Sequence, residues 1–112
     1  MNKNIRQLIF PFHKEETQVT DGKELNVGAG YVLMNISVTG NATGFNLVVE
    51  AKSNDIDYYT PVTIANLDGY NLSNTIIANG KYQLSLEGFT KVRLRLSSIA
   101  GGNVSVIGTI VN

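Results

Sequence analysis

The 112-residue chain contains no cysteine, no tryptophan, two prolines and one histidine. Without cysteine, disulfide bonds and thiolate metal sites are excluded, and small domains that fold outside the cell commonly carry disulfides. We therefore expect synthesis in the cytoplasm. The single histidine, His13, leaves too few imidazoles for a zinc site. The sequence accordingly predicts no metal and no cofactor.

An excess of charge of one sign is also lacking. Nine lysines and arginines balance nine aspartates and glutamates, so the formal net charge is zero. A neutral chain has no long-range attraction for nucleic acid or for an anionic membrane. The apolar run Leu8-Ile9-Phe10 is ended by Pro11, which makes it too short for a signal-peptide core or a membrane span. We expect neither nucleic acid nor a membrane as a partner.

What the sequence does contain is a series of short runs in which apolar and polar residues alternate, separated by turn residues. This pattern is typical of half-buried strands. The clearest runs are 32–38, 45–51, 81–87, 91–96 and 104–110, and weaker ones are 5–10, 17–20, 58–64 and 74–77. The spacing predicts an all-β fold, an antiparallel β-sandwich or jelly roll of roughly eight strands.

The first fifteen residues differ from the rest of the chain. They hold an apolar patch, Leu8, Ile9, Phe10 and Phe12, but little clean alternation. Residues 1–15 are either a first strand or an N-terminal arm that docks on a partner through this patch, and both interpretations stay open. Residues 16–112 are expected to form a single β-sandwich domain, because their length fits one hydrophobic core.

The last two runs of alternation are expected to form a hairpin. A two-residue turn at Gly101-Gly102 would put the two strands out of phase. A three-residue loop, 100–102, instead pairs Leu96 with Val106 and Val92 with Ile110. We prefer this register.

Several apolar residues fall at positions that the alternation directs away from the core: Tyr31, Leu33, Val48, Ile107 and Val111. A face fully exposed to water rarely gathers so many apolar side chains, so either a second layer of the same chain or a neighbouring subunit covers them. We favour a neighbour. Together with Leu8, Ile9, Phe10 and Phe12, these five are the candidate partner-binding residues.

No set of residues predicts catalysis. His13 has no nucleophile in a recognisable context and is interpreted as a surface residue. Asp55 and Asp57 could in principle serve a glycosidase or hold calcium, but the calcium-loop glycine and distal glutamate are missing. A polar turn is the preferred interpretation of this pair. The sequence therefore predicts that the protein is not an enzyme.

Two further sets of side chains could recognise a ligand. Tyr58, Tyr59 and Tyr70 are a candidate ligand platform, because exposed tyrosines on a sandwich can stack on sugars, although tyrosine is also an ordinary strand residue. Lys91, Arg93 and Arg95 alternate along one side of a strand. We expect cross-strand neutralisation of this row by Glu50 or Glu87.

The chain also resembles small β-sandwich domains of bacteriophage structural proteins, in particular head-decoration, head-fibre and tail-associated proteins. The resemblance is carried by an ordered series of segments: strand 45–53, an aromatic (Tyr58 or Tyr59) before Pro61-Val62, Asn79-Gly80-Lys81-Tyr82, the arginine-bearing strand 88–98 and the glycine-turned segment 101–109. The aromatic is tyrosine here, where these domains frequently have tryptophan. The resemblance implies a repeated virion component that is homo-oligomeric, often a trimer, with no cofactor and no catalytic residues.

Two functions follow as hypotheses. The first is an auxiliary capsid protein, a decoration or cement that binds the major capsid protein or another virion protein on the outer surface of a phage head. The alternative is a receptor-binding or carbohydrate-binding module of a phage tail or fibre. The expected location in either case is the virion, after synthesis in the cytoplasm of the bacterial host.

Overall fold

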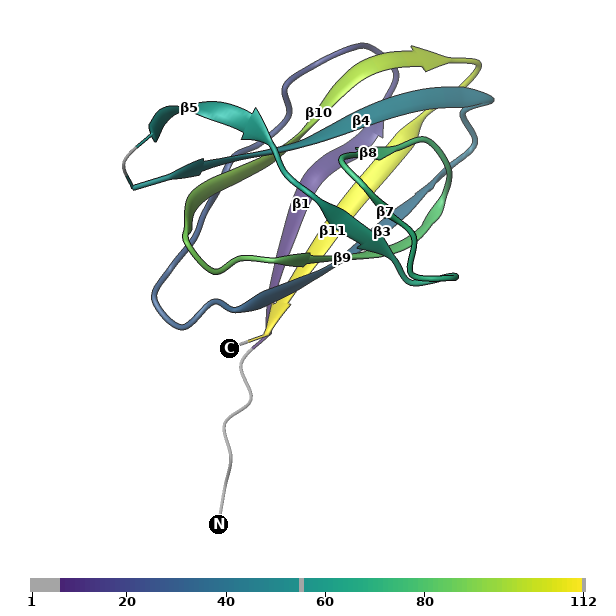
Figure 1. Cartoon of the computed structure of the whole chain (residues 1–112). Helices are drawn as coiled ribbons and strands as arrows, with labels where there is room; N and C mark the ends of the chain where they lie inside the picture. The colour runs from purple at the N-terminus through teal and green to yellow at the C-terminus, as the bar shows by residue number, and fades with distance from the viewer. Residues whose placement is uncertain (1–6, 55, 112) are drawn as a thin grey trace.

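Figure 1 shows the computed structural model of the chain, which describes residues 7–54 and 56–111. The strands are β1 (Gln7–Glu16), β2 (Leu25–Asn26), β3 (Leu33–Gly40), β4 (Gly44–Ser53), β5 (Ile56–Pro61), β6 (Ile64–Asn66), β7 (Leu72–Ser73), β8 (Thr75–Ile76), β9 (Gly80–Ser85), β10 (Phe89–Ala100) and β11 (Val104–Val111). Within these residues no helix is long and apolar enough to span a membrane.

The strands form two sheets. A six-stranded sheet has the order β1-β11-β3-β9-β6-β7, and a five-stranded sheet has the order β2-β10-β4-β5 with β8 also paired to β4. All pairings are antiparallel. The predicted all-β antiparallel sandwich is confirmed. The strand count exceeds the expected one because β2 and β7 have only two residues each, too few to produce an alternating pattern, and because the run 58–64 is divided between β5 and β6.

The core lies between the two sheets and follows from the alternation. Met34 and Ile36 of β3 face inward from the six-stranded sheet, and Leu94 and Leu96 of β10 face them from the five-stranded sheet. All four side chains are at most 1% exposed. Burying each of these side chains stabilises the fold by on the order of 1.5–3 kcal/mol. The period-two pattern therefore determines which face of each sheet packs against the other sheet.

Residues 7–16, left open between an arm and a first strand, form β1. This strand pairs with β11 from Gln7 opposite Val111 to Glu16 opposite Val104, and it forms one edge of the six-stranded sheet. The side chain of Phe12 is 1% exposed within the core. Residues 1–6, the remainder of the expected arm, lie outside the described residues.

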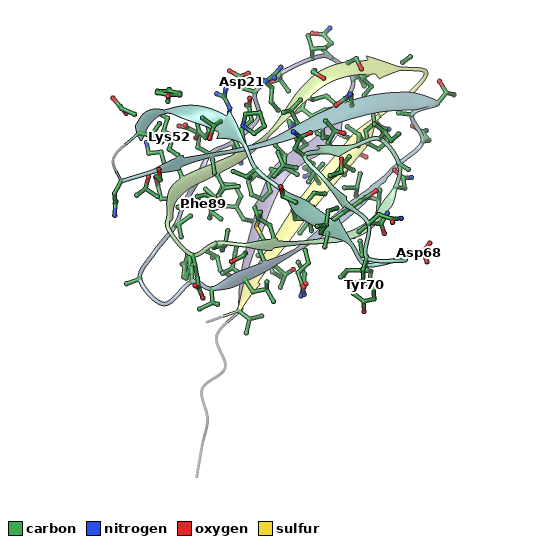
Figure 2. All side chains as sticks on the ribbon, viewed as in Figure 1. Asp21, Lys52, Asp68, Tyr70 and Phe89 are labelled. Atoms are coloured by element: carbon green, nitrogen blue, oxygen red, sulfur yellow. The ribbon has the colours of Figure 1, made fainter. Side chains whose placement is uncertain are left out.

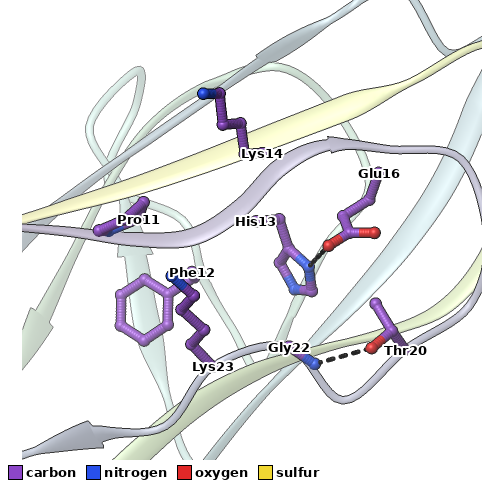
Figure 3. A pocket seen from close by; sticks show the side chains of 8 residues that line it. All are labelled: Pro11, Phe12, His13, Lys14, Glu16, Thr20, Gly22 and Lys23. Atoms are coloured by element: carbon purple, nitrogen blue, oxygen red, sulfur yellow. Dashed lines mark hydrogen bonds and ion pairs between the residues drawn. The ribbon is translucent and has the colours of Figure 1, made fainter.

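The expectation that His13 is a surface residue is wrong. His13 is 2% exposed, and its Nε2 is hydrogen-bonded to the main-chain carbonyl oxygen of Leu94 in the opposite sheet. Register shifts on either side of His13 in its pairing with β11 accompany this inward placement. Figure 3 shows the ring between Glu16 and the segment that carries Gly22. Alternation could not reveal this, because an irregular edge strand has no regular period.

The expected hairpin between the last two long strands is also wrong. β10 belongs to the five-stranded sheet and β11 to the six-stranded sheet, so the link between them crosses from one layer to the other. Gly101 and Gly102 both have positive φ, 71° and 144°, which lets the chain turn sharply here. The carbonyl oxygen of Asn103 then accepts hydrogen bonds from the main-chain N–H groups of Asn41 and Ala42. The crossing link is thereby tied to the β3–β4 link, which crosses beside it.

Candidate functional site

The outer face of the six-stranded sheet carries a contiguous apolar patch over β1, β11 and β3, which lie side by side in Figure 1. We call this patch the outer strip; it consists of Ile9, Pro11, Leu33, Ile107 and Val111. Pro11 lies directly opposite Ile107, and Val111 lies directly opposite Leu33. Ile9 is 64% exposed and Ile107 is 41% exposed. Directly opposed residues of an antiparallel pair share a face, so these side chains lie together on the outside.

The other candidate partner-binding residues lie elsewhere. Phe10 and Tyr31 are partly buried against the core, and Phe12 is inside it. Leu8 lies opposite the buried Ile110 and is therefore on the inner side of β1, near its end. Val48 belongs to β4 of the five-stranded sheet and is half-buried opposite Arg95. The strip thus unites Ile9, Leu33, Ile107 and Val111 with Pro11, which the sequence pattern did not single out.

The outer face of the five-stranded sheet is polar and carries paired charges. Glu50 of β4 is 7% exposed, and its Oε1 accepts hydrogen bonds from Nε of Arg93 at 2.9 Å and from Nε of Arg95 at 3.2 Å. Arg93 also lies 3.5 Å from a carboxylate oxygen of Asp21. The expected neutralisation of the arginine row is confirmed for Glu50. This face therefore presents compensated charge and not a free basic patch.

Tyr59 is engaged in the same network. The guanidinium carbon of Arg93 lies 4.0 Å from the centre of its ring and Lys52 Nζ lies 4.9 Å from it, which are cation–π distances. The Tyr59 hydroxyl donates a hydrogen bond to the carboxylate of Glu24. Burial raises the pKa of the Tyr59 phenol well above its ordinary value, and the bond to Glu24 raises this pKa further. The same bond is the main cause that lowers the pKa of Glu24.

Replacing Tyr59 with phenylalanine should raise the pKa of the Glu24 carboxyl towards its ordinary value of 4.5, because the main stabilising donor is lost. Because the pKa of Glu24 is lower in the folded protein, the ionised carboxylate stabilises the fold at pH values above its unfolded-state pKa. This stabilisation is lost as the pH falls through the folded-state pKa of Glu24. NMR titration of the Glu24 side-chain carboxyl measures the shift. Tyr58→Phe is the matched control and should leave the titration unchanged. Identical titrations for the parent and Tyr59→Phe would contradict the assignment.

The three candidate platform tyrosines are not on one surface. Tyr58 and Tyr59 belong to β5 of the five-stranded sheet, whereas Tyr70 belongs to the turn between β6 and β7 of the six-stranded sheet. In Figure 2 Tyr70 lies far from Lys52, the lysine that contacts the Tyr59 ring. Tyr58 and Tyr70 are 65% and 73% exposed.

Tyr70 borders a groove on the same outer face that carries the strip. The groove has a volume of about 550 Å³ and is lined by Asn35, Ile36, Ser37, Leu67, Tyr70, Lys81, Gln83 and Thr109. These residues come from β3, β9, β11 and the β6–β7 turn. Of the groove residues, the sequence pattern identified only Tyr70 as a candidate. The others are polar residues at outward positions of β3, β9 and β11, together with the core residue Ile36 and Leu67 of the β6–β7 turn. Their convergence depends on the strand order β11-β3-β9, which cannot be read from the sequence.

Across residues 7–54 and 56–111, no three or more His, Cys, Asp or Glu side chains are placed to hold a metal ion. The ring of His13 is buried and hydrogen-bonded to the main-chain carbonyl oxygen of Leu94. Asp55, half of the carboxylate pair considered from the sequence, lies outside the described residues, while Asp57 is exposed near Lys52. The outer face of the six-stranded sheet therefore carries two candidate contact features, the apolar strip and the groove beside Tyr70.

The fold is an antiparallel β-sandwich that carries an apolar strip and a groove on the outer face of its six-stranded sheet. The XepA family model matches residues 6–110, and the chain belongs to this family. Its fold is shared with the SPBc2 prophage-derived protein YomS, with 20% sequence identity, a TM-score of 0.89 and coverage of 100% of this chain and 98% of that one. It is also shared with the PBSX exported protein XepA, with 22% identity and a TM-score of 0.91. That match covers 100% of this chain but 40% of the XepA chain. No curated protein matches the sequence.

Proposed function

We propose that the protein is a non-enzymatic structural component of a bacteriophage particle, an auxiliary capsid protein that binds the outer surface of the head. The outer strip is the observation that carries this proposal. Its five residues are contiguous on one face, and three of them, Ile9, Leu33 and Ile107, are exposed large apolar side chains. A contiguous exposed apolar patch is typical of a protein contact site.

The energetics suit a protein that is present in many copies. Covering a few hundred Å² of apolar surface at about 25 cal/mol per Å² contributes several kcal/mol before the costs of association. One such contact is weak in isolation. On a shell of repeated subunits, contacts made by linked copies reinforce one another, so a small strip is enough for stable attachment.

The partners we propose are the major capsid protein or another virion protein, together with further copies of this chain. The strip includes residues of β1, an edge strand whose register shifts and Pro11 hinder continuous strand addition. A partner is therefore expected to cover the face of the sheet and not to extend it. Membership of the XepA family and the fold shared with a prophage-derived protein support a phage origin.

The strip is tested by replacing Ile107 with aspartate, which places a charge in the centre of the proposed contact. We expect the fraction of protein that sediments with purified empty heads to fall at least about tenfold, since burying an unpaired carboxylate costs several kcal/mol. Co-sedimentation measures the bound fraction, and light scattering on the free protein reports its oligomeric state.

Ile77→Asp is the matched control, because Ile77 is an isoleucine that is 68% exposed and lies outside the strip. This variant should bind heads like the parent protein. If the parent does not sediment with heads, the decoration role is wrong. If Ile107→Asp binds as well as Ile77→Asp does, the strip is not the contact surface.

A further inference from the structure

We infer that the groove beside Tyr70 is a binding site for an oligosaccharide. The inference does not depend on the proposed function, because the groove and the outer strip are separate sets of residues. Its volume of about 550 Å³ falls in the range of small-molecule binding sites. The nature of its lining determines the class of ligand.

The floor of the groove is a lattice of polar side chains on three adjacent strands. Thr109, Asn35 and Gln83 lie opposite one another across β11, β3 and β9, and Ser37 and Lys81 form the next row. The amide nitrogen of Gln83 donates a hydrogen bond to the amide oxygen of Asn35 at 3.1 Å. This bond orients both amides, so the nitrogen of Asn35 is left as a donor and the oxygen of Gln83 as an acceptor for a ligand.

One wall of the groove is formed by the β6–β7 turn with Leu67 and Tyr70. The turn is held in place: the main-chain N–H of Leu67 donates to the Lys81 carbonyl oxygen at 3.0 Å, and that of Asn66 donates to the Asn71 carbonyl oxygen at 2.8 Å. The aromatic ring is therefore carried on a turn that is anchored to the floor of the groove.

Tyr70 itself adopts an unusual conformation. Its φ is +58°, in the left-handed region that residues other than glycine rarely occupy, and its side chain is 73% exposed. Strained positions of this kind cluster at ligand-binding sites, where the fold holds a side chain in a required place. Figure 2 shows Tyr70 and Asp68 at the outer end of this turn.

The charge and polarity of the groove residues indicate the class of ligand. Lys81 is the one charged residue among the eight that line the groove. Nucleic acid or a phosphate-rich polymer would call for several cations. Two amides, two hydroxyls and an aromatic ring instead match the hydroxyl groups and apolar faces of sugar rings. The groove is partly open to solvent, so a sugar chain longer than the site can extend beyond it.

The experiment is an NMR titration of the isotopically labelled, full-length protein with tetrasaccharides of N-acetylglucosamine, of β-linked glucose and of α-linked glucose, each at millimolar concentration. At least one sugar should shift the side-chain amide signals of Asn35 and Gln83. Tyr70→Ala should weaken that sugar's binding by about tenfold, the loss expected for one aromatic stacking contact.

Two variants make the result specific. Tyr70→Phe retains the ring and should bind almost like the parent protein. Tyr58→Ala removes a comparably exposed tyrosine from the other sheet and should have no effect. The inference is overturned if none of the three sugars shifts these signals, if the shifts map to β5, or if Tyr58→Ala weakens binding as much as Tyr70→Ala does.

Discussion

Replacing Phe12 with alanine should lower the free energy of unfolding by about 3–5 kcal/mol, the usual cost of truncating a buried phenylalanine. Phe12 is 1% exposed, and its ring packs edge-to-face on Phe10 with 4.8 Å between the ring centres. Removing it leaves a void at the junction of β1 with the core and loses an aromatic pair. Urea denaturation measures the change, and the melting temperature should fall by roughly 10 °C or more.

The matched control lies on the same strand. Ile9→Ala removes apolar atoms from a side chain that is 64% exposed, so its effect should remain within about 0.5 kcal/mol. The comparison separates two roles for the N-terminal segment. If Phe12→Ala is as mild as Ile9→Ala, then β1 contributes little to the fold and acts as an arm docked on an otherwise complete sandwich.

The layers of this fold could be predicted from the sequence, because burial dictates them. Alternation along 32–38 and 91–96 identifies the side chains that face inward, and Ile36 and Leu94 are indeed in the core. Alternation does not say which strand lies next to which. The strands 91–96 and 104–110 satisfy the same pattern whether they pair with each other or face each other across the core. The predicted hairpin was wrong for this reason.

The candidate surfaces show the same limit. The outward apolar positions at Leu33, Ile107 and Val111 are visible in the sequence and do lie together, because β3 and β11 are neighbours. The alternation also directs Val48 away from the core, but Val48 lies on the other sheet. The alternation predicts that a side chain points away from the core. The order of the strands in the sheets determines on which outer face that side chain lies. The groove beside Tyr70 depends almost wholly on strand order.

His13 closes a gap in the five-stranded sheet that strand pairing leaves open. On the side of β10 away from β4, Val92 pairs with Leu25 and Leu96 pairs with Thr20. Leu94 lies between these two pairings, where residues 21–24 have no pairing with β10. Its carbonyl oxygen would be buried without a partner, and Nε2 of His13 from the opposite sheet supplies the missing donor.

The loop between Thr20 and Leu25 is shaped around this ring. At Gly22 a Cβ atom would lie 2.5 Å from Cε1 of His13, so only glycine lets the chain pass this close. The main-chain N–H of Lys23 donates to the Phe12 carbonyl oxygen at 3.3 Å, which fastens the loop to β1. Figure 3 shows these residues around the imidazole. His13 therefore joins β1, the loop and β10 at one point.

His13→Ala should lower the free energy of unfolding by about 3 kcal/mol. An unpaired buried carbonyl costs about 1–3 kcal/mol, and the void left by the ring adds to this cost. His13→Gln places an amide nitrogen within reach of the Leu94 oxygen and should recover a large part of the loss. Urea denaturation of both variants measures the difference, with the exposed neighbour Lys14→Ala as the control. Equal losses for alanine and glutamine would mean that the imidazole acts by filling space and that its hydrogen bond across the sandwich contributes nothing.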